Sequence, residues 1–146
     1  MKRQAAGFTL LELTQVVAGI GIFAAASVPM FKQILLQAKT AQAPILMHAV
    51  AHRIHVAREE RRTVEACGFT PAKFPAADGE TFTTDACWSA LGFHPKSSVY
   101  YQLGIVADDA GHFRVIARSD LDEDEVVAEW TLDVDASTLQ RSVGAF

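Results

Sequence analysis

The sequence predicts an α+β protein in which a long N-terminal helix packs against a C-terminal antiparallel β-meander, with the first half of that helix spanning a membrane. Three observations predict this fold. An apolar run extends from Phe8 to about Phe31, and apolar residues then recur at helical spacing to about residue 62. Apolar and polar residues alternate over much of 98–146. The length of 146 residues suits one domain beside the helix.

Composition excludes several classes of protein. Hydrophobic residues make up 50% of the chain and charged residues 21%, which rules out a disordered protein. Acidic residues outnumber basic ones over 98–146, so we expect no general nucleic-acid binding. The sequence carries no nucleophile elbow, phosphate-binding glycine loop, zinc-protease motif or dinucleotide fingerprint, so we expect a protein that is not an enzyme and needs no cofactor.

The apolar run sets the orientation of the chain in a membrane. It is long enough for a spanning helix, which needs about 20 residues. Lys2 and Arg3 precede it and place the N-terminus on the cytoplasmic side. The remainder then lies in an oxidising space, where we expect Cys67 and Cys87 to form a structural disulfide. Catalytic thiols are disfavoured because the spacing is not Cys-x-x-Cys.

Two ordinary readings of this run remain open. One is a cleaved secretory signal with a cut near 24–27, and the other is a simple signal anchor. Glu12 fits neither, because a carboxylate in a hydrophobic span costs about 2–3 kcal/mol near its centre and less near an end. Such a residue usually has a partner and a function.

The residues around Glu12 resemble a known sequence motif. The run Gly7-Phe8-Thr9-Leu10-Leu11-Glu12-Leu13 resembles the processing motif of the type IV pilin and pseudopilin family. The resemblance implies that a prepilin peptidase cuts between Gly7 and Phe8 and that Phe8 is then N-methylated. It also implies a type IV pilin-like fold. Gly21 and Pro29 match further family positions, and the resemblance covers residues 1 to about 37.

The resemblance also implies how the chain is processed, inserted into the membrane and assembled, as follows. Residues 1–7 are the leader peptide, 8–36 the transmembrane and assembly helix, and 37–146 the soluble head. The precursor crosses the inner membrane once, in contact with lipid, with its head in the periplasm. An inner-membrane assembly platform then builds it, with copies of itself and other pilins, into a helical cell-surface pilus filament. Such filaments serve adhesion, twitching motility or DNA uptake. The alternatives are a pseudopilin of a type II secretion system and a monomeric membrane-anchored binding domain.

Glu12 is the strongest candidate for an assembly residue. Cleavage creates an ammonium group on Phe8, four residues before Glu12 and on the same helix face. At about 4 Å, such a pair attracts by about 4 kcal/mol at an effective dielectric constant near 20. In the family, the counterpart of Glu12 contacts the N-terminus of an adjacent subunit. Gly21 and Pro29 weaken the helix, which gives either a segment that melts during assembly or a kink without consequence.

The head is predicted in three parts. An amphipathic helix continues to about residue 62, bends near Pro44 and ends in a solvated charge run over 58–62. A connecting loop over 63–97 contains a short helical turn at 85–91, and an antiparallel sheet over 98–146 ends in an edge strand. The helix is expected to cover the sheet with one apolar stripe, made of Ile34, Leu35, Ala38, Ala41, Ile45, Ala49 and Val56.

Two side-chain groups are candidate metal ligands. His48, His52 and His55 share one helix flank, but we favour packing against the sheet or a neighbouring subunit over metal binding. The alternating carboxylates of a predicted turn would suit calcium. Glu125 and Thr131 stand where a calcium loop needs glycine and glutamate, so an acidic hairpin turn is the favoured interpretation. The carboxylates are Asp120, Asp122 and Asp124.

Overall fold

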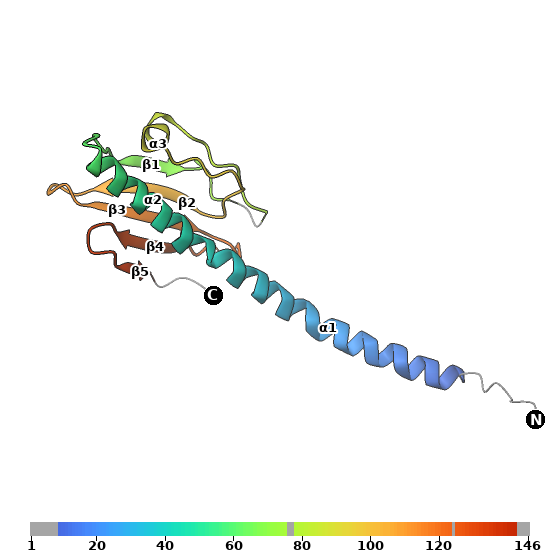
Figure 1. Ribbon diagram of the computed structural model, residues 1–146. Helices are drawn as coiled ribbons and strands as arrows, with labels where there is room; N and C mark the ends of the chain where they lie inside the picture. Colours follow the sequence, from blue (N-terminus) through green and yellow to red (C-terminus); the bar gives the residue numbers. More distant parts are fainter. Residues whose placement is uncertain (1–8, 76–77, 124, 143–146) are drawn as a thin grey trace, which may run out of the picture. The chain divides into compact units, whose positions relative to one another are not determined.

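The computed structural model of the chain describes residues 9–75, 78–123 and 125–142 (Figure 1). The chain divides into two compact units, Met1–Gln37 and Ala38–Phe146, and we call the second one the head unit. A long N-terminal helical region precedes a C-terminal antiparallel sheet. The predicted α+β class is therefore confirmed.

The helical region consists of two helices in succession. Helix α1 spans Leu10–Thr40 and helix α2 spans Gln42–Glu59. The helical run Leu10–Glu59 is long and apolar enough to cross a membrane. Pro29 lies inside α1 without ending it.

The junction between α1 and α2 lies at Ala41, three residues before the predicted bend at Pro44. Proline has no N–H to donate to the carbonyl of Thr40, and its ring crowds that carbonyl, so the interruption falls one turn earlier. The side chain of Gln42 ties the start of α2 to an extended segment. Its Nε2 donates to the Ser98 carbonyl at 3.2 Å, and its Oε1 accepts from the Tyr100 N–H at 2.9 Å.

The sheet is an antiparallel meander. Its strands lie side by side in the order β1 to β5, and β2, β3 and β4 pair in continuous register. Their alternating apolar residues predict them correctly. The predicted edge strand in the tail corresponds to β5. The strands are β1 Cys67–Thr70, β2 Gln102–Ala107, β3 Phe113–Ser119, β4 Ala128–Asp133 and β5 Leu139–Arg141.

Strand β1 corrects the prediction for residues 63–97. That region is not only a connection, because β1 pairs with β2 through Cys67↔Ile105 and Thr70↔Leu103. The strand has four residues and an irregular register, so no alternation marks it in the sequence. Pairing across a long stretch of intervening chain creates it.

Helix α2 lies against one face of the sheet (Figure 1). The buried side chains between them form the core of the head unit. The buried side of α2 differs from the predicted stripe. Ala41 and Ala49 are exposed, and the side chain of Ile45 is 68% exposed. The predicted stripe is therefore wrong for this helix, whose opposite side faces the sheet. The buried residues of α2 are Ala43, Met47, Val50, Ala51, Ile54 and Ala57.

The predicted helical turn at 85–91 is confirmed as α3, Ala86–Leu91. Asp85 caps its N-terminus by accepting the Trp88 N–H at 3.0 Å, and Gly92 ends it with a φ of 72°. The ring of Trp88 packs edge-on against Phe82, with centroids 5.2 Å apart. Trp88 is fully buried and joins α3 to the core.

Candidate functional site

The start of α1 holds the predicted assembly residue in a defined set of hydrogen bonds. Thr9 precedes the helix, and Glu12 lies in its first turn. The backbone N–H and the hydroxyl of Thr9 both donate to Glu12 Oε2 at 2.8 Å. In return, the Glu12 N–H donates to Thr9 Oγ1 at 3.3 Å. Gly7 and Phe8, the predicted cleavage and methylation residues, lie outside the described residues.

This reciprocal arrangement is a capping box. It satisfies N–H groups that have no partner within the helix and places a carboxylate at the positive end of the helix dipole. The sequence signal for this box is Thr-x-x-Glu ahead of an apolar run, and it was not among the features predicted above. The carboxylate of Glu12 therefore has a local partner in Thr9, and any contact with an ammonium group adds to that one.

Helix α1, all of which the structure describes, has no buried residue. Leu10 is 81% exposed and Phe23 is 77% exposed. A Cβ added at Gly21 would meet nothing within 4 Å. Exposed apolar surface of this extent is typical of a site that contacts a membrane or another protein. The large exposed apolar residues of α1 are Leu10, Leu11, Leu13, Val16, Val17, Ile20, Ile22, Phe23, Val28, Met30, Phe31, Ile34 and Leu35.

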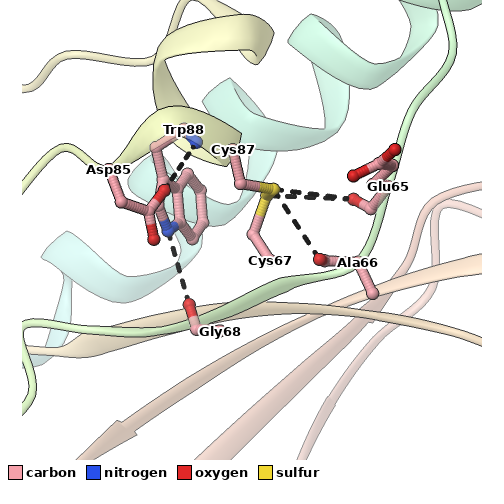
Figure 2. Close-up of a disulfide and its surroundings, with 7 residues drawn as sticks. All are labelled: Glu65, Ala66, Cys67, Gly68, Asp85, Cys87 and Trp88. Carbon is pink, nitrogen blue, oxygen red and sulfur yellow. Dashed lines mark hydrogen bonds between the residues drawn. A yellow bond between two sulfur atoms is a disulfide. The ribbon is translucent and has the colours of Figure 1, made fainter.

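The predicted disulfide is present and joins β1 to α3. The Cα atoms of Cys67 and Cys87 are 5.7 Å apart, at a sequence separation of 20. The sulfur atoms of Cys67 and Cys87 lie 3.8 and 3.9 Å from the carbonyl oxygen of Glu65. Figure 2 shows the bridge beside this carbonyl. Disulfide sulfurs carry no hydrogen, so these are polar contacts rather than hydrogen bonds. Beside the bridge, Trp88 Nε1 donates to the Gly68 carbonyl at 3.3 Å, which makes a second link between the two elements.

An open pocket of about 510 Å³ lies next to the disulfide. The end of α2, the segment over 63–67 and α3 form its walls, and the disulfide lines it. Its charged lining residues are the acidic Glu65 and Asp85. The carboxylate of Asp85 is already used in capping α3. The pocket is thus a mainly apolar hollow around a structural bridge.

Arg58 connects three elements at one end of the head unit. Its guanidinium pairs with Asp135 in the turn after β4, donates to the Gly111 carbonyl in the β2–β3 turn at 3.3 Å, and lies 5.2 Å from the Phe113 ring centroid. The hydrogen bond from Arg58 holds the pKa of Asp135 below its ordinary value. The interpretation of 58–62 as a solvated run is therefore wrong for this residue.

The β2–β3 turn is held by Asp108. Its Oδ1 accepts the N–H groups of His112 at 2.8 Å and Ala110 at 3.0 Å, and its Oδ2 lies 3.2 Å from the His112 ring. The backbone bond from His112 is the main reason that the pKa of Asp108 is lowered. This carboxylate acts as a turn-forming group.

The structure bears differently on the two groups of candidate metal ligands, the aspartates and the helix histidines. Asp120 accepts the Glu125 N–H at 3.2 Å, whereas Asp124 lies outside the described residues, so the predicted calcium trio stays a prediction. Over 9–75, 78–123 and 125–142, no three His, Cys, Asp or Glu side chains converge on a metal position. The helix histidines do not pack against the sheet, because these three side chains are exposed: His48, His52 and His55. Their packing against a neighbouring subunit stays a prediction.

Searches against protein-family models, curated proteins and solved structures find no match to this chain.

Proposed function

We propose that this chain is the structural subunit of a type IV pilus, made as a precursor and polymerised through its N-terminal helix. The observation that carries the proposal is that an apolar helix with no buried residue precedes a folded, disulfide-linked head unit. A helix with no buried residue needs lipid before assembly and neighbouring helices after it. A prepilin peptidase would remove residues 1–7 and leave methylated Phe8 as the new N-terminus.

The first turn of α1 supports a role for Glu12 in assembly. Thr9 supplies two hydrogen bonds to its carboxylate, but these neutral donors leave its negative charge in place. In hydrocarbon that charge favours a nearby cation. The ammonium group of a processed Phe8, in the same chain or in a neighbour, is a cation at this level of the helix. Where the pair forms between neighbouring chains, a misplaced subunit would leave the charge without a cation, so such a pair would also set the axial register.

The disulfide favours a pilus over the pseudopilus of a type II secretion system. A pilus is exposed outside the cell and is pulled, and a cross-link between β1 and α3 keeps the region over 67–87 joined under load. The assembled filament would contain copies of this chain and other pilins, built by an inner-membrane platform.

The direct test is mass spectrometry of the N-terminus, performed separately on sheared surface material and on membranes. We expect chains that begin at methylated Phe8 in the sheared fraction. Processed chains confined to the membranes would instead support the pseudopilin. A chain that retains residues 1–7, or one cut near Ala26, would contradict the proposal and leave a membrane-anchored binding domain.

Two matched variants separate the charge of Glu12 from its role as a cap. Glu12→Gln retains an oxygen that can accept from Thr9 but removes the charge, whereas Thr9→Val removes the hydroxyl and retains the charge. We expect Glu12→Gln to be processed yet missing from sheared filaments, and Thr9→Val still to form filaments. Equal loss of filaments in both variants would show that the cap matters rather than the charge.

A further inference from the structure

Two imidazoles lie next to each other on the solvent-facing side of α2. His48 and His52 are four residues apart, and both side chains are exposed. Helix geometry places side chains at this spacing on one face, with Cβ atoms about 5–6 Å apart. Within the part of the chain that the structure describes, neither imidazole takes part in a hydrogen bond or an ion pair. We propose that His48 and His52 form a two-ligand site for a borderline-soft divalent transition-metal ion such as Zn²⁺ or Cu²⁺.

The chemistry of the pair selects this class of ion. Neutral imidazole nitrogens bind Zn²⁺ at about 2.0–2.1 Å, and two histidines four residues apart on a helix can reach one ion. Imidazole suits zinc, copper and nickel, whereas calcium and magnesium prefer oxygen ligands. Because no third protein ligand converges on the pair among the described residues, water would fill the remaining coordination positions.

The surroundings of the pair are free of nearby cationic side chains on the same helix face. Ile45, Ala49 and Val56, each of which lies three or four residues from one of the two histidines, are uncharged. Arg53 follows His52 in sequence, but its guanidinium approaches Gly92, lying 3.9 Å from the position of a Cβ added there.

His55 belongs to a different environment. Arg58 follows His55 by three residues in α2, so this imidazole has a guanidinium group one turn away on its own helix, and that positive charge repels a metal ion. We therefore assign the site to the first two histidines of the flank and not to the third.

The test is titration of the full-length chain in detergent with Cu²⁺ or Zn²⁺ alone, without a polyhistidine tag. Calorimetry gives the affinity and the stoichiometry, and electron paramagnetic resonance of Cu²⁺ reports nitrogen ligands. We expect one ion per chain, and at least about a tenfold loss of affinity in the double variant His48→Asn/His52→Asn. Because both side chains are exposed, the near-ultraviolet circular dichroism of the folded head should not change.

Single variants at the other histidines are the matched controls. His55→Asn, His94→Asn and His112→Asn each remove one imidazole from outside the pair. Each should leave the affinity unchanged. The proposal is overturned if the chain binds neither ion, if the double variant binds as tightly as the parent, or if a control variant accounts for the loss.

Discussion

Opening the disulfide between Cys67 and Cys87 should destabilise the head unit strongly. The bridge closes a loop with a sequence separation of 20. The chain-entropy relation for a loop of about this length gives roughly 11 cal/mol/K, or about 3 kcal/mol at 25 °C. Most of the effect acts on the unfolded chain. In the folded protein, α3 stays attached to β1 through the hydrogen bond from Trp88 to Gly68.

The expected change in melting temperature follows from the size of the head unit, Ala38–Phe146. At an unfolding entropy of about 2.1 cal/mol/K per residue, 3 kcal/mol corresponds to a decrease of about 13 °C. Near-ultraviolet circular dichroism suits the measurement because the buried ring of Trp88 reports the packing beside the bridge. The full-length chain is heated in detergent in three forms: oxidised, reduced, and as the variant Cys67→Ala/Cys87→Ala.

The reduced parent protein separates the cross-link from packing. It keeps both sulfur atoms, so its melting temperature measures the loss of the bridge alone. The double alanine variant also loses contacts at Cys67, which is buried, and should melt at the same temperature or lower. If the oxidised and reduced forms melt within about 2 °C of each other, the bridge does not restrain the unfolded chain and the entropic reasoning is wrong.

Two further substitutions test other contacts of the head unit. Gly104→Ala would place a Cβ 2.9 Å from the ring of Phe69, so we expect a loss of about 1–3 kcal/mol in urea unfolding. The loss should shrink when Phe69→Leu is added, and strict additivity would contradict the clash. Asp135→Asn removes a carboxylate whose folded pKa is lowered by Arg58. That pairing stabilises the fold above the ordinary pKa of 3.8 and is lost as the pH falls through the lower folded value. The variant should therefore be less stable than the parent near pH 7, by at most about 1 kcal/mol, and the difference should shrink as the pH falls below 3.8. A difference that persists at acid pH would exclude the ion pair as its source.

Features that depend on neighbouring residues could be predicted from the sequence. The apolar run gives α1, because a helix satisfies its own backbone hydrogen bonds whatever surrounds it. Asp85 and Gly92 delimit α3 as a capping residue and a left-handed glycine. The alternation of apolar residues predicts β2, β3 and β4, since one face of the meander must be buried. The pairing of two cysteines was also predictable, because the chain has no others.

Which side of α2 is buried was decided by the tertiary structure. This helix carries apolar residues on opposite sides, with Ile45 outward and Met47 inward. If the apolar periodicity of α1 is extended through the junction at Ala41 into α2, it selects the apolar residues that face outward. Contact with β3 and β4 determines which of the two apolar sides of α2 is buried. That contact joins residues that are distant in sequence.

Two other features that the sequence did not predict also arise from contacts between segments that are distant in sequence. Strand β1 exists because β2 supplies its hydrogen-bonding partners, and four residues leave no periodic signal of their own. Arg58 looks like part of a solvated charge run until the turn after β4 brings Asp135 beside it. Local sequence determined where helices and strands can form, because caps, turns and periodicity act over a few residues. The fold decided which surfaces meet, because burial and ion pairing act between segments that only folding brings together.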